Sequence, residues 1–272
     1  MSKTILITGA SRGFGHLWTK AFLQQGYQVA ATARNLTSLD ELKAEFGAQL
    51  LPLQLDVTDR QAAIRTVQQA HQQFGRIDVL INNAGYGLFG SVEETSEQQA
   101  RQLMDTNFFG LLWLTQAVLP IMREQGAGHI IQVSSVLGLI TWPNVGLYNA
   151  SKFAVEGLSE TLASEVNIFG VHVSLVEPAP YATDYAGSSA VITQPIPAYD
   201  ALKASLQAQY ADLSMGQPEA TTAAILQLIE SQQPPLRLLM GELAYPLVKQ
   251  GYNNRFAEWD AWDDVARAAH RL

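Results

Sequence analysis

The chain opens with Lys3-Thr4-Ile5-Leu6-Ile7-Thr8-Gly9-Ala10-Ser11-Arg12-Gly13-Phe14-Gly15. The short apolar run at its start predicts a buried strand, and a helical pattern follows from Leu17 to Gln25. A glycine-rich turn in that position lets the backbone approach a pyrophosphate, whose charge the helix N-terminus favours. The same glycines would also suit a turn that needs only conformational freedom. The strand before the turn and the helix after it favour nucleotide binding.

A second motif lies near the middle of the chain, in Ser134-Ser135 and Tyr148-Asn149-Ala150-Ser151-Lys152. His129 to Ser134 predicts a short buried strand. Tyr148 and Lys152 are four residues apart, so on a helix they stack one turn apart on one face. Tyr-x-x-x-Lys also occurs on solvated helix faces, so this pattern gains weight only beside the glycine-rich turn.

Such a constellation suits proton transfer. A free tyrosine has a pKa near 10, and an ammonium group beside its ring favours the phenolate. A serine hydroxyl facing the pair can donate a hydrogen bond to a carbonyl oxygen while the tyrosine gives or takes the proton. The spacing therefore predicts acid–base chemistry at a carbonyl or alcohol group.

Several motifs in order resemble the classical short-chain dehydrogenases/reductases. They are Thr8 to Gly15 as Thr-Gly-x-x-x-Gly-x-Gly, Asn82-Asn83-Ala84-Gly85, Asn107, Ser135, Tyr148 and Lys152. The resemblance extends from about residue 3 to residue 183, and the spacing of Gly9, Gly13 and Gly15 fits the classical branch. It implies a Rossmann-type, doubly wound α/β fold. We expect a mostly parallel, seven-stranded sheet with helices on both faces.

The resemblance also implies roles for individual residues. The catalytic set is Asn107, Ser135, Tyr148 and Lys152, with Ser135 chosen over Ser134 because it lies thirteen residues before Tyr148. Asn107 lies in a helical pattern from about Ser96 to Arg123, where it would hold a water that connects Lys152 to solvent. An amide satisfied within the core is the alternative. The implied cofactor-binding residues are Gly9, Ser11, Arg12, Gly13, Phe14, Gly15, Arg34, Asn35, Asp56, Val57, Asn83, Ala84, Gly85, Tyr148, Lys152, Pro178 and Thr183.

The end of the second predicted strand, at Ala33-Arg34-Asn35, bears on cofactor choice. An acidic residue there accepts from a free ribose 2′-hydroxyl, whereas an arginine accommodates a 2′-phosphate. No carboxylate is present, and Arg12 is a second cation on the same side. We therefore expect NADP(H) in preference to NAD(H), with an ordinary solvated Arg34 as the alternative.

Two of these cofactor assignments have competing structural roles, and one neighbouring position departs from the family pattern. Asp56 would hydrogen-bond the adenine, but it also stands where a carboxylate can cap the following helix. Asn83-Ala84-Gly85 would lie against the cofactor, stabilise the sheet, or do both. Ala179 follows Pro178 where the family has glycine, so a positive φ at that position would strain the chain.

Residues 1–272 predict one domain, with no linker or repeat to divide them. Residues 184–216 match no motif, and the resemblance implies that they form the family's substrate lid. The apolar lining of this lid would come from Val191, Ile192, Ile196 and Leu202. An ordinary surface loop is the alternative. Residues 245–272 predict a helical tail whose Trp259, Trp262 and Val265 would pack on the body or on a partner subunit.

The composition of the chain argues against several other classes of protein. A content of 47% hydrophobic and 15% charged residues is typical of a globular chain. The net charge of −8 argues against nucleic-acid binding. No run is long enough to span a bilayer, no signal-peptide pattern is present, and cysteine is absent. We therefore expect a cytoplasmic protein without membrane, metal or disulfide chemistry.

The sequence thus predicts an NADP(H)-dependent oxidoreductase that interconverts a carbonyl and an alcohol, on a hydrophobic substrate. A catalytically silent NADP(H) sensor of the same fold is the second hypothesis. A non-redox enzyme resembling the halohydrin dehalogenases is disfavoured, because those enzymes lack the glycine-rich loop and the lysine that this chain has. By analogy we expect a homo-oligomer, dimer or tetramer, formed through the helices around Asn107 and Tyr148.

Overall fold

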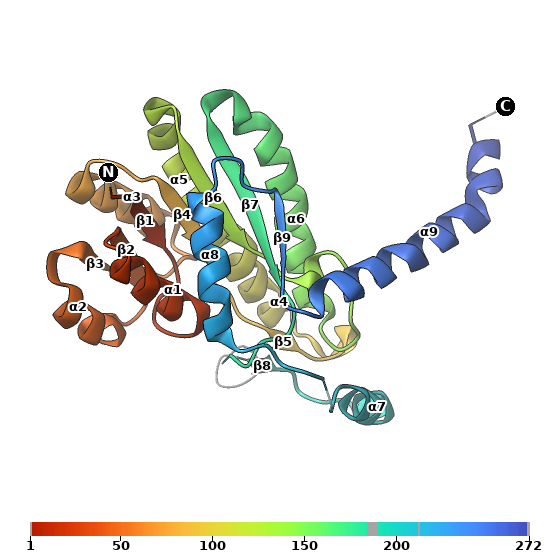
Figure 1. Ribbon diagram of the computed structural model, residues 1–272. Coiled ribbons are helices and arrows are strands. Elements are labelled where there is room, and N and C mark those ends of the chain that lie inside the picture. Colours follow the sequence, from red (N-terminus) through yellow and green to blue (C-terminus); the bar gives the residue numbers. More distant parts are fainter. Residues whose placement is uncertain (1, 184–189, 212, 271–272) are drawn as a thin grey trace.

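A parallel β-sheet organises the protein, as the computed structural model of residues 2–183, 190–211 and 213–270 shows (Figure 1). Seven strands are ordered β3-β2-β1-β4-β6-β7-β9, and every neighbouring pair is parallel. Their bounds are β1 Thr4–Ile7, β2 Gln28–Ala33, β3 Leu50–Gln54, β4 Val79–Asn82, β6 Gly128–Val133, β7 Val171–Pro178 and β9 Arg237–Met240. The strand order reverses between β1 and β4, which is where this fold places its ligands. The predicted doubly wound sheet is confirmed.

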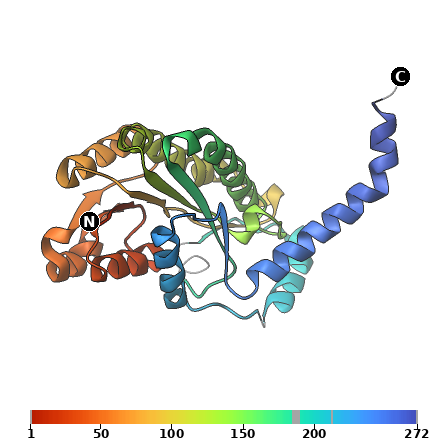
Figure 2. The same ribbon diagram turned by 45° about the horizontal axis from the view of Figure 1, so that its top comes forward.

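Helices cover both faces of this sheet (Figure 2). They are α1 Gly13–Gln24, α2 Asp40–Phe46 and α8 Thr221–Glu230 on one face, and α3 Arg60–Phe74, α5 Gly110–Gln125 and α6 Gly146–Val166 on the other. The further helices of the described residues are α4 Glu97–Met104, α7 Asp200–Tyr210 and α9 Ala244–Ala268. Alternate strand residues point to opposite faces. Ile5 and Ile7 therefore join the core under α1, α2 and α8, while Leu6 joins the core under α3, α5 and α6.

The helix predicted from about Ser96 to Arg123 is not continuous. A π-helical turn, η4 (Asp105–Phe109), separates α4 from α5 and contains Asn107. The wider turn of a π-helix places an extra residue in the helical path, and such turns are frequent at functional sites. The sequence carries no proline or glycine that would mark this interruption inside the turn.

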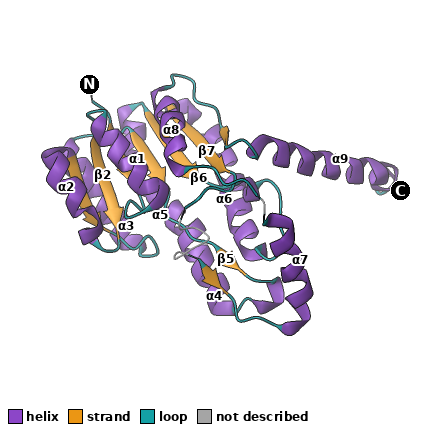
Figure 3. Ribbon diagram, turned by 60° about the horizontal axis from the view of Figure 1, so that its bottom comes forward, coloured by secondary structure: helices purple, strands orange, loops and turns teal. Residues whose placement is uncertain are grey.

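A two-stranded parallel ribbon lies apart from the main sheet, formed by β5 (Leu88–Phe89) and β8 (Val191–Ile192). It joins the loop after β4 to the segment predicted as a lid, of which residues 184–189 and 212 lie outside the described residues. Figure 3 shows α7, the helix of that segment, on the same side of the molecule as β5 and α4. We call residues 190–211 and 213–216 the lid segment.

The tail is helical as predicted, but its outer part does not pack on the body. Helix α9 leaves the body and projects away from it in both views (Figures 1 and 2). Ala244 and Val248 are buried at its base, whereas Trp259 and Trp262 are 56% and 65% exposed. Val265 is 59% exposed, and residues 271–272 lie outside the described part of the chain. Among the described residues, no helix has the length and apolar character needed to cross a membrane.

Candidate active site

A cavity of about 1120 Å³ opens at the carboxyl ends of the parallel strands. The segments that follow β1, β2, β4, β6 and β7 all contribute to its lining. It therefore brings together the glycine-rich turn and the Ser/Tyr/Lys motif, which are more than 100 residues apart in sequence. Of the predicted site residues, Gly9, Ser11, Arg12, Gly13, Phe14, Arg34, Asp56, Val57, Asn83, Ala84, Gly85, Ser135, Tyr148, Lys152, Pro178 and Thr183 line it.

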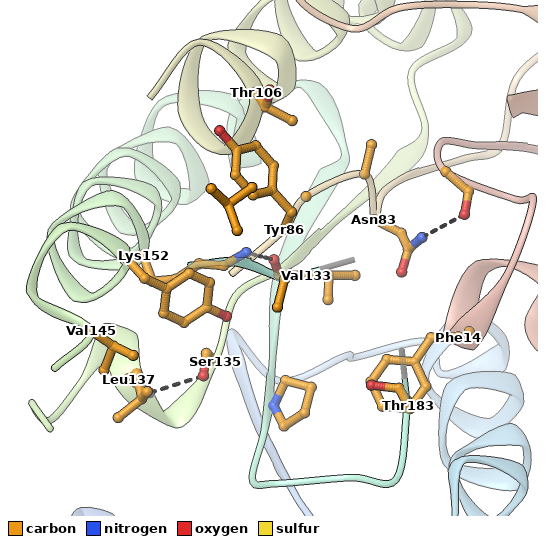
Figure 4. A pocket seen from close by; sticks show the side chains of 18 of the residues that line it. Phe14, Asn83, Tyr86, Thr106, Val133, Ser135, Leu137, Val145, Lys152 and Thr183 are labelled. Carbon is orange, nitrogen blue, oxygen red and sulfur yellow. Dashed lines mark hydrogen bonds between the residues drawn. The ribbon is translucent and has the colours of Figure 1, made fainter. Parts of the chain in front are cut away.

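The glycine-rich turn is packed so closely that side chains are excluded at two positions. A Cβ at Gly15 would lie 2.2 Å from the Gly9 carbonyl oxygen and 2.5 Å from Asn83 Nδ2. A Cβ at Gly9, where φ is +68°, would lie 3.0 Å from the Ala84 Cα. Asn83 Nδ2 donates to the carbonyls of Thr8 and Gly9 at 2.9 and 3.2 Å, which holds the turn against the end of β4 (Figure 4). Asn83 therefore has a structural role at the edge of the cavity.

Two exposed arginines border the end of the cavity that the glycine-rich turn lines. Arg12 precedes α1 without capping it by its side chain, and Arg34 follows β2. Neither guanidinium forms an ion pair with another described residue. The first amides of α1 and these two cations make this end of the cavity favourable for phosphate groups.

The two neighbouring polar residues have local partners. Asn35 does not line the cavity with the others; its Oδ1 accepts from the Thr37 amide at 3.1 Å and caps the following 3-10 turn. Asp56 does line it, and its Oδ1 accepts from the Thr58 amide and hydroxyl at 3.0 and 2.8 Å. Asp59, rather than Asp56, caps α3 through the Ala62 amide.

Ser135, Tyr148 and Lys152 line the other end of the cavity. Figure 4 shows Ser135 and Lys152 there, beside Val133. Ser135 Oγ accepts from the Leu137 amide at 3.1 Å, which places the hydroxyl at the start of the turn after β6. Lys152 Nζ lies 5.7 Å from the centroid of the Tyr148 ring and donates to the Val133 carbonyl at 2.8 Å. Burial lowers the pKa of Lys152 to about 8, against the opposing charge of Glu156. Ser134 and Ser135 are both buried, and Ser134 is the less exposed of the two.

The side chains of Asn107 and Lys152 both lie close to Gly85. Asn107 Oδ1 accepts from the Tyr86 amide at 3.0 Å, and its Nδ2 donates to the Tyr86 carbonyl at 3.0 Å and to Ser151 Oγ at 3.2 Å. A Cβ at Gly85 would lie 3.1 Å from Asn107 Oδ1 and 3.8 Å from Lys152 Nζ. The side-chain amide is thus satisfied within the core and lies close to the ammonium group.

Ala179 in the segment after β7 causes no strain. Among the described residues, Asn144 is the one non-glycine residue with a positive φ, so Ala179 does not need glycine's freedom. Its amide donates to the Met240 carbonyl at 2.9 Å, which continues the pairing of β7 with β9. Beyond it, Tyr181 packs edge-on against Phe14 at 5.3 Å between ring centroids.

The end of the cavity beyond Ser135 includes residues that the sequence did not single out. Trp142 and Tyr210 stack at 4.8 Å between ring centroids with 20° between their planes, and both line the cavity. Further lining comes from Tyr86, Phe89, Leu206, Leu213 and Met215. Of the predicted lid residues, Val191 lines the cavity, but Ile192 is 75% exposed, and neither it, Ile196 nor Leu202 does so. The prediction failed for these three because the side of the lid segment that faces the cavity depends on how the segment docks on the body.

One buried carboxylate attaches the lid segment to the body. Glu94 accepts from the Ile196 amide at 2.7 Å and from Lys203 Nζ, and its pKa is lowered to about 2, chiefly by the hydrogen bond from Lys203. It also accepts from the Ser91 amide at 2.8 Å. These contacts fix the position of α7, and hence that of Tyr210, over the cavity.

Known proteins share both sequence and fold with this chain. The short chain dehydrogenase family matches residues 3–191. Oxidoreductase BOA17 of Botryotinia fuckeliana is 36% identical over 99% of this chain and 100% of its own length. The 3-ketodihydrosphingosine reductase of Bacteroides thetaiotaomicron is 36% identical over 98% and 96%. Human retinol dehydrogenase 8 is 36% identical over 86% and 80%.

Solved structures agree with these relatives. A short-chain dehydrogenase from Streptomyces avermitilis superposes with a TM-score of 0.92 at 36% identity, covering 98% of this chain and 99% of its own. An NAD complex of a short-chain dehydrogenase/reductase from Burkholderia phymatum has a TM-score of 0.82 at 26% identity, over 94% and 95%. An alcohol dehydrogenase from Thermococcus sibiricus, complexed with 5-hydroxy-NADP, has a TM-score of 0.75 at 25% identity, over 88% and 96%.

The chain therefore belongs to the short-chain dehydrogenase/reductase family, and the resemblance drawn from its motifs is confirmed. It is an oxidoreductase of a fold that uses a nicotinamide dinucleotide.

Proposed function

We propose that the protein is an NADP(H)-dependent oxidoreductase that interconverts a carbonyl and an alcohol, with Tyr148 as the acid–base group. The observation that carries this proposal is the shared cavity: one space is lined both by the glycine-rich turn and by Ser135, Tyr148 and Lys152. A cofactor bound along the turn and a substrate held at the serine and tyrosine would then meet inside it.

The residues at the turn fit a dinucleotide. The close approach of Gly15 to Gly9 leaves room for a pyrophosphate beside the backbone, and α1 directs its N-terminus to the same place. The cofactor would be held by the turn, by Val57 and Ala84 beside the adenosine, and by Lys152, Pro178 and Thr183 at the nicotinamide end. When bound, the nicotinamide ring supplies or accepts the hydride.

The chain's own residues perform the proton chemistry. The Ser135 hydroxyl donates to the substrate carbonyl oxygen and stabilises the negative charge that develops there. Tyr148 gives its proton to that oxygen in reduction and removes it in alcohol oxidation. The Lys152 ammonium beside the ring favours the phenolate that reduction leaves. Asn107 keeps Tyr86 and Ser151 in place, and a water relay from Lys152 past Asn107 would restore the proton.

The preference for NADP(H) is supported by charge. Arg12 and Arg34 border the adenosine end, and no carboxylate follows β2 at the position where a ribose 2′-hydroxyl would be bound. A 2′-phosphate there would gain two cations whose guanidinium groups have no ion-pair partner among the described residues.

The substrate is proposed to be hydrophobic. Aromatic and aliphatic side chains, including Trp142, Tyr210 and Leu206, line the end of the cavity beyond Ser135. Two relatives are named for 3-ketodihydrosphingosine and for retinol, which are both lipids with an apolar chain and one polar end. Either type of molecule would place its reacting oxygen at Tyr148 and its chain under the lid segment.

The direct test measures loss of NADPH absorbance, and separately of NADH absorbance, with a panel of ketones and aldehydes of graded length and polarity. We expect turnover with NADPH and a preference for the apolar ketones and aldehydes of the panel. Binding of NADPH without turnover on the panel or on the corresponding alcohols would favour the silent sensor. A polar-only substrate profile would contradict the hydrophobic pocket.

We also propose that the protein is a homo-oligomer. Phe109 and Phe153, near the N-terminal ends of α5 and α6, are 37% and 36% exposed, and helix α9 adds the exposed Trp259 and Trp262. Exposed aromatic groups of this kind favour burial in an interface. Light scattering of the intact chain after gel filtration decides among monomer, dimer and tetramer; a monomer at micromolar concentration would contradict the proposal.

A further inference from the structure

Two buried carboxyl groups, those of Glu156 on α6 and Glu177 on β7, have no part in the proton transfer described above. Glu156 is 5% exposed and Glu177 is fully buried. One guanidinium serves both: Arg237 Nε lies 3.2 Å from Glu156 Oε2 and 3.4 Å from Glu177 Oε1. Arg237 Nη2 also contacts the exposed Glu160 at 2.8 Å. A single cation therefore faces three carboxyl groups, of which two are buried.

The carboxyl oxygen atoms that lack a hydrogen bond indicate a shared proton. Neither oxygen of Glu177 receives a hydrogen bond from a described group, and nor does Glu156 Oε1. Two ionised carboxylates can only accept, so one proton between them converts a repulsion into a hydrogen bond. Burial and the neighbouring charge of Glu156 raise the pKa of Glu177 to about 9, and burial also raises the pKa of Glu156. Glu177 is the more buried of the two and lies farther from Arg237, so we place the shared proton on Glu177. Glu156, which faces Arg237 more closely, keeps the negative charge.

Glu156 continues the row of Tyr148 and Lys152 along one face of α6. The three residues are spaced at intervals of four, so each lies one turn from the next, with about 6 Å between neighbouring Cβ atoms. Lys152 Nζ donates a hydrogen bond to the neutral carbonyl of Val133. The negative charge of Glu156 raises the pKa of Lys152, against the effect of burial. The Ser134 hydroxyl is packed beside Glu156 under Gly138, where a Cβ would lie 2.7 Å from Ser134 Oγ and 2.9 Å from Glu156 Cγ.

We propose that Glu156 is a positioning residue whose charge keeps Lys152 protonated, and that Glu177 holds the proton that lets this single charge persist in the buried pair. The pair thereby sets the pH range in which Tyr148 can act as an acid. This inference rests on the proposed function, because it concerns proton transfer by Tyr148. The charged and titratable groups that face the pair are Lys152 and Glu160 from α6 and Arg237 from β9.

Matched amide variants test the proposal through the pH dependence of kcat/KM for carbonyl reduction. Removing the anion in Glu156→Gln makes proton loss from Lys152 and Tyr148 easier, so the alkaline limb moves to lower pH by about one unit. Glu177→Gln donates an amide hydrogen to Glu156 and preserves its charge, so its limb coincides with that of the natural protein. Glu160→Gln removes an exposed partner of Arg237 and should also leave the limb in place.

An unshifted limb in Glu156→Gln, or equal shifts in Glu156→Gln and Glu177→Gln, would overturn the inference. Rescue by Glu156→Asp, which restores the charge, would support it against a purely structural role.

A second measurement does not need turnover. The folded pKa of Glu177 is raised above its ordinary value of 4.5, so its protonation stabilises the fold fully below pH 4.5, and that stability is lost as pH rises toward 9. Glu177→Gln cannot lose this proton. Urea unfolding should therefore show the natural protein losing stability relative to Glu177→Gln between pH 5 and pH 8. Parallel stability curves would contradict the shared proton, whereas absence of turnover in the natural protein would contradict only the proposed function.

Discussion

Lys152 Nζ donates a hydrogen bond to the carbonyl oxygen of Val133 at 2.8 Å. Val133 ends β6, and Ser134 and Ser135 follow it directly. This contact therefore ties the helix that carries Tyr148 to the strand end that carries Ser135, across 19 residues of sequence. The spacing of the three side chains depends on the docking of α6 against β6 and not on the loop between them.

The close packing of the glycine-rich turn predicts that Gly15→Ala is destabilising and weakens cofactor binding. Its Cβ would lie 2.2 Å from the Gly9 carbonyl oxygen, so the turn must open, at a cost of about 1–3 kcal/mol. Gly157→Ala on α6 is the matched control, because no atom lies within 4 Å of its Cβ. That variant should gain about 0.5–1 kcal/mol of stability through helix propensity. Urea denaturation and NADPH fluorescence titration measure both effects; equal behaviour of the two variants would refute the packing argument.

Arg34→Asp should reverse the cofactor preference. An aspartate after β2 repels a 2′-phosphate and accepts from a free 2′-hydroxyl, so the KM for NADPH should rise roughly 10- to 100-fold while that for NADH falls. Arg65→Asp makes the same charge change at an exposed position of α3, outside the cavity lining, and should leave the ratio unchanged. A constant NADPH/NADH ratio in Arg34→Asp would show that Arg34 does not meet the phosphate.

The stacked pair at the substrate end predicts selectivity by size. Tyr210→Ala removes the ring that lies 4.8 Å from Trp142, so long apolar carbonyls should lose about 10-fold in kcat/KM. Short carbonyl substrates do not reach α7 and should be affected little. Gln207→Ala, on the exposed side of the same helix, tests for effects of helix stability alone. An equal loss of kcat/KM for short and long substrates would show that the substitution disturbs the whole lid segment, and would contradict selectivity by size.

His129 predicts a loss of stability in acid. Burial, together with the positive charges of His172 and Lys3, lowers its pKa to about 3 from 6.5. A histidine with a depressed folded pKa contributes stability above pH 6.5 that is lost as pH falls toward 3. At pH 5 the loss relative to pH 7.5 should be about 2 kcal/mol. His129→Gln should lose less stability than the natural protein over this interval, whereas His270→Gln, at an exposed position after α9, should lose as much as the natural protein.

The fold was predictable from local patterns. The apolar runs that became β1, β4 and β6, and the glycine-rich turn between β1 and α1, each carry their signal in a few adjacent residues. The grouping of Ser135, Tyr148 and Lys152 was predictable because their order and spacing match the motif of the family, although the docking of α6 against β6 sets their relative positions.

Features that depend on docking were not predictable. The π-turn at Asn107 has no marker in the sequence, and the inward side of α7 is set by Glu94, more than 100 residues away from Lys203. Glu156 and Glu177 likewise look like ordinary polar positions until β7, β9 and α6 bring them onto Arg237. The apolar residues of helix α9 do not pack on the body in its outer part, and their packing on a partner subunit stays a prediction.

Tyr148→Phe is the most direct test of the central claim. The substitution removes one hydroxyl from a side chain that is 5% exposed, so folding and NADPH binding should remain close to those of the natural protein. Carbonyl reduction followed at saturating NADPH should fall by about 10²- to 10⁴-fold, since the acid that protonates the developing alkoxide is lost. A Tyr148→Phe variant that binds NADPH and turns over at the natural rate would show that Tyr148 is not the acid–base group.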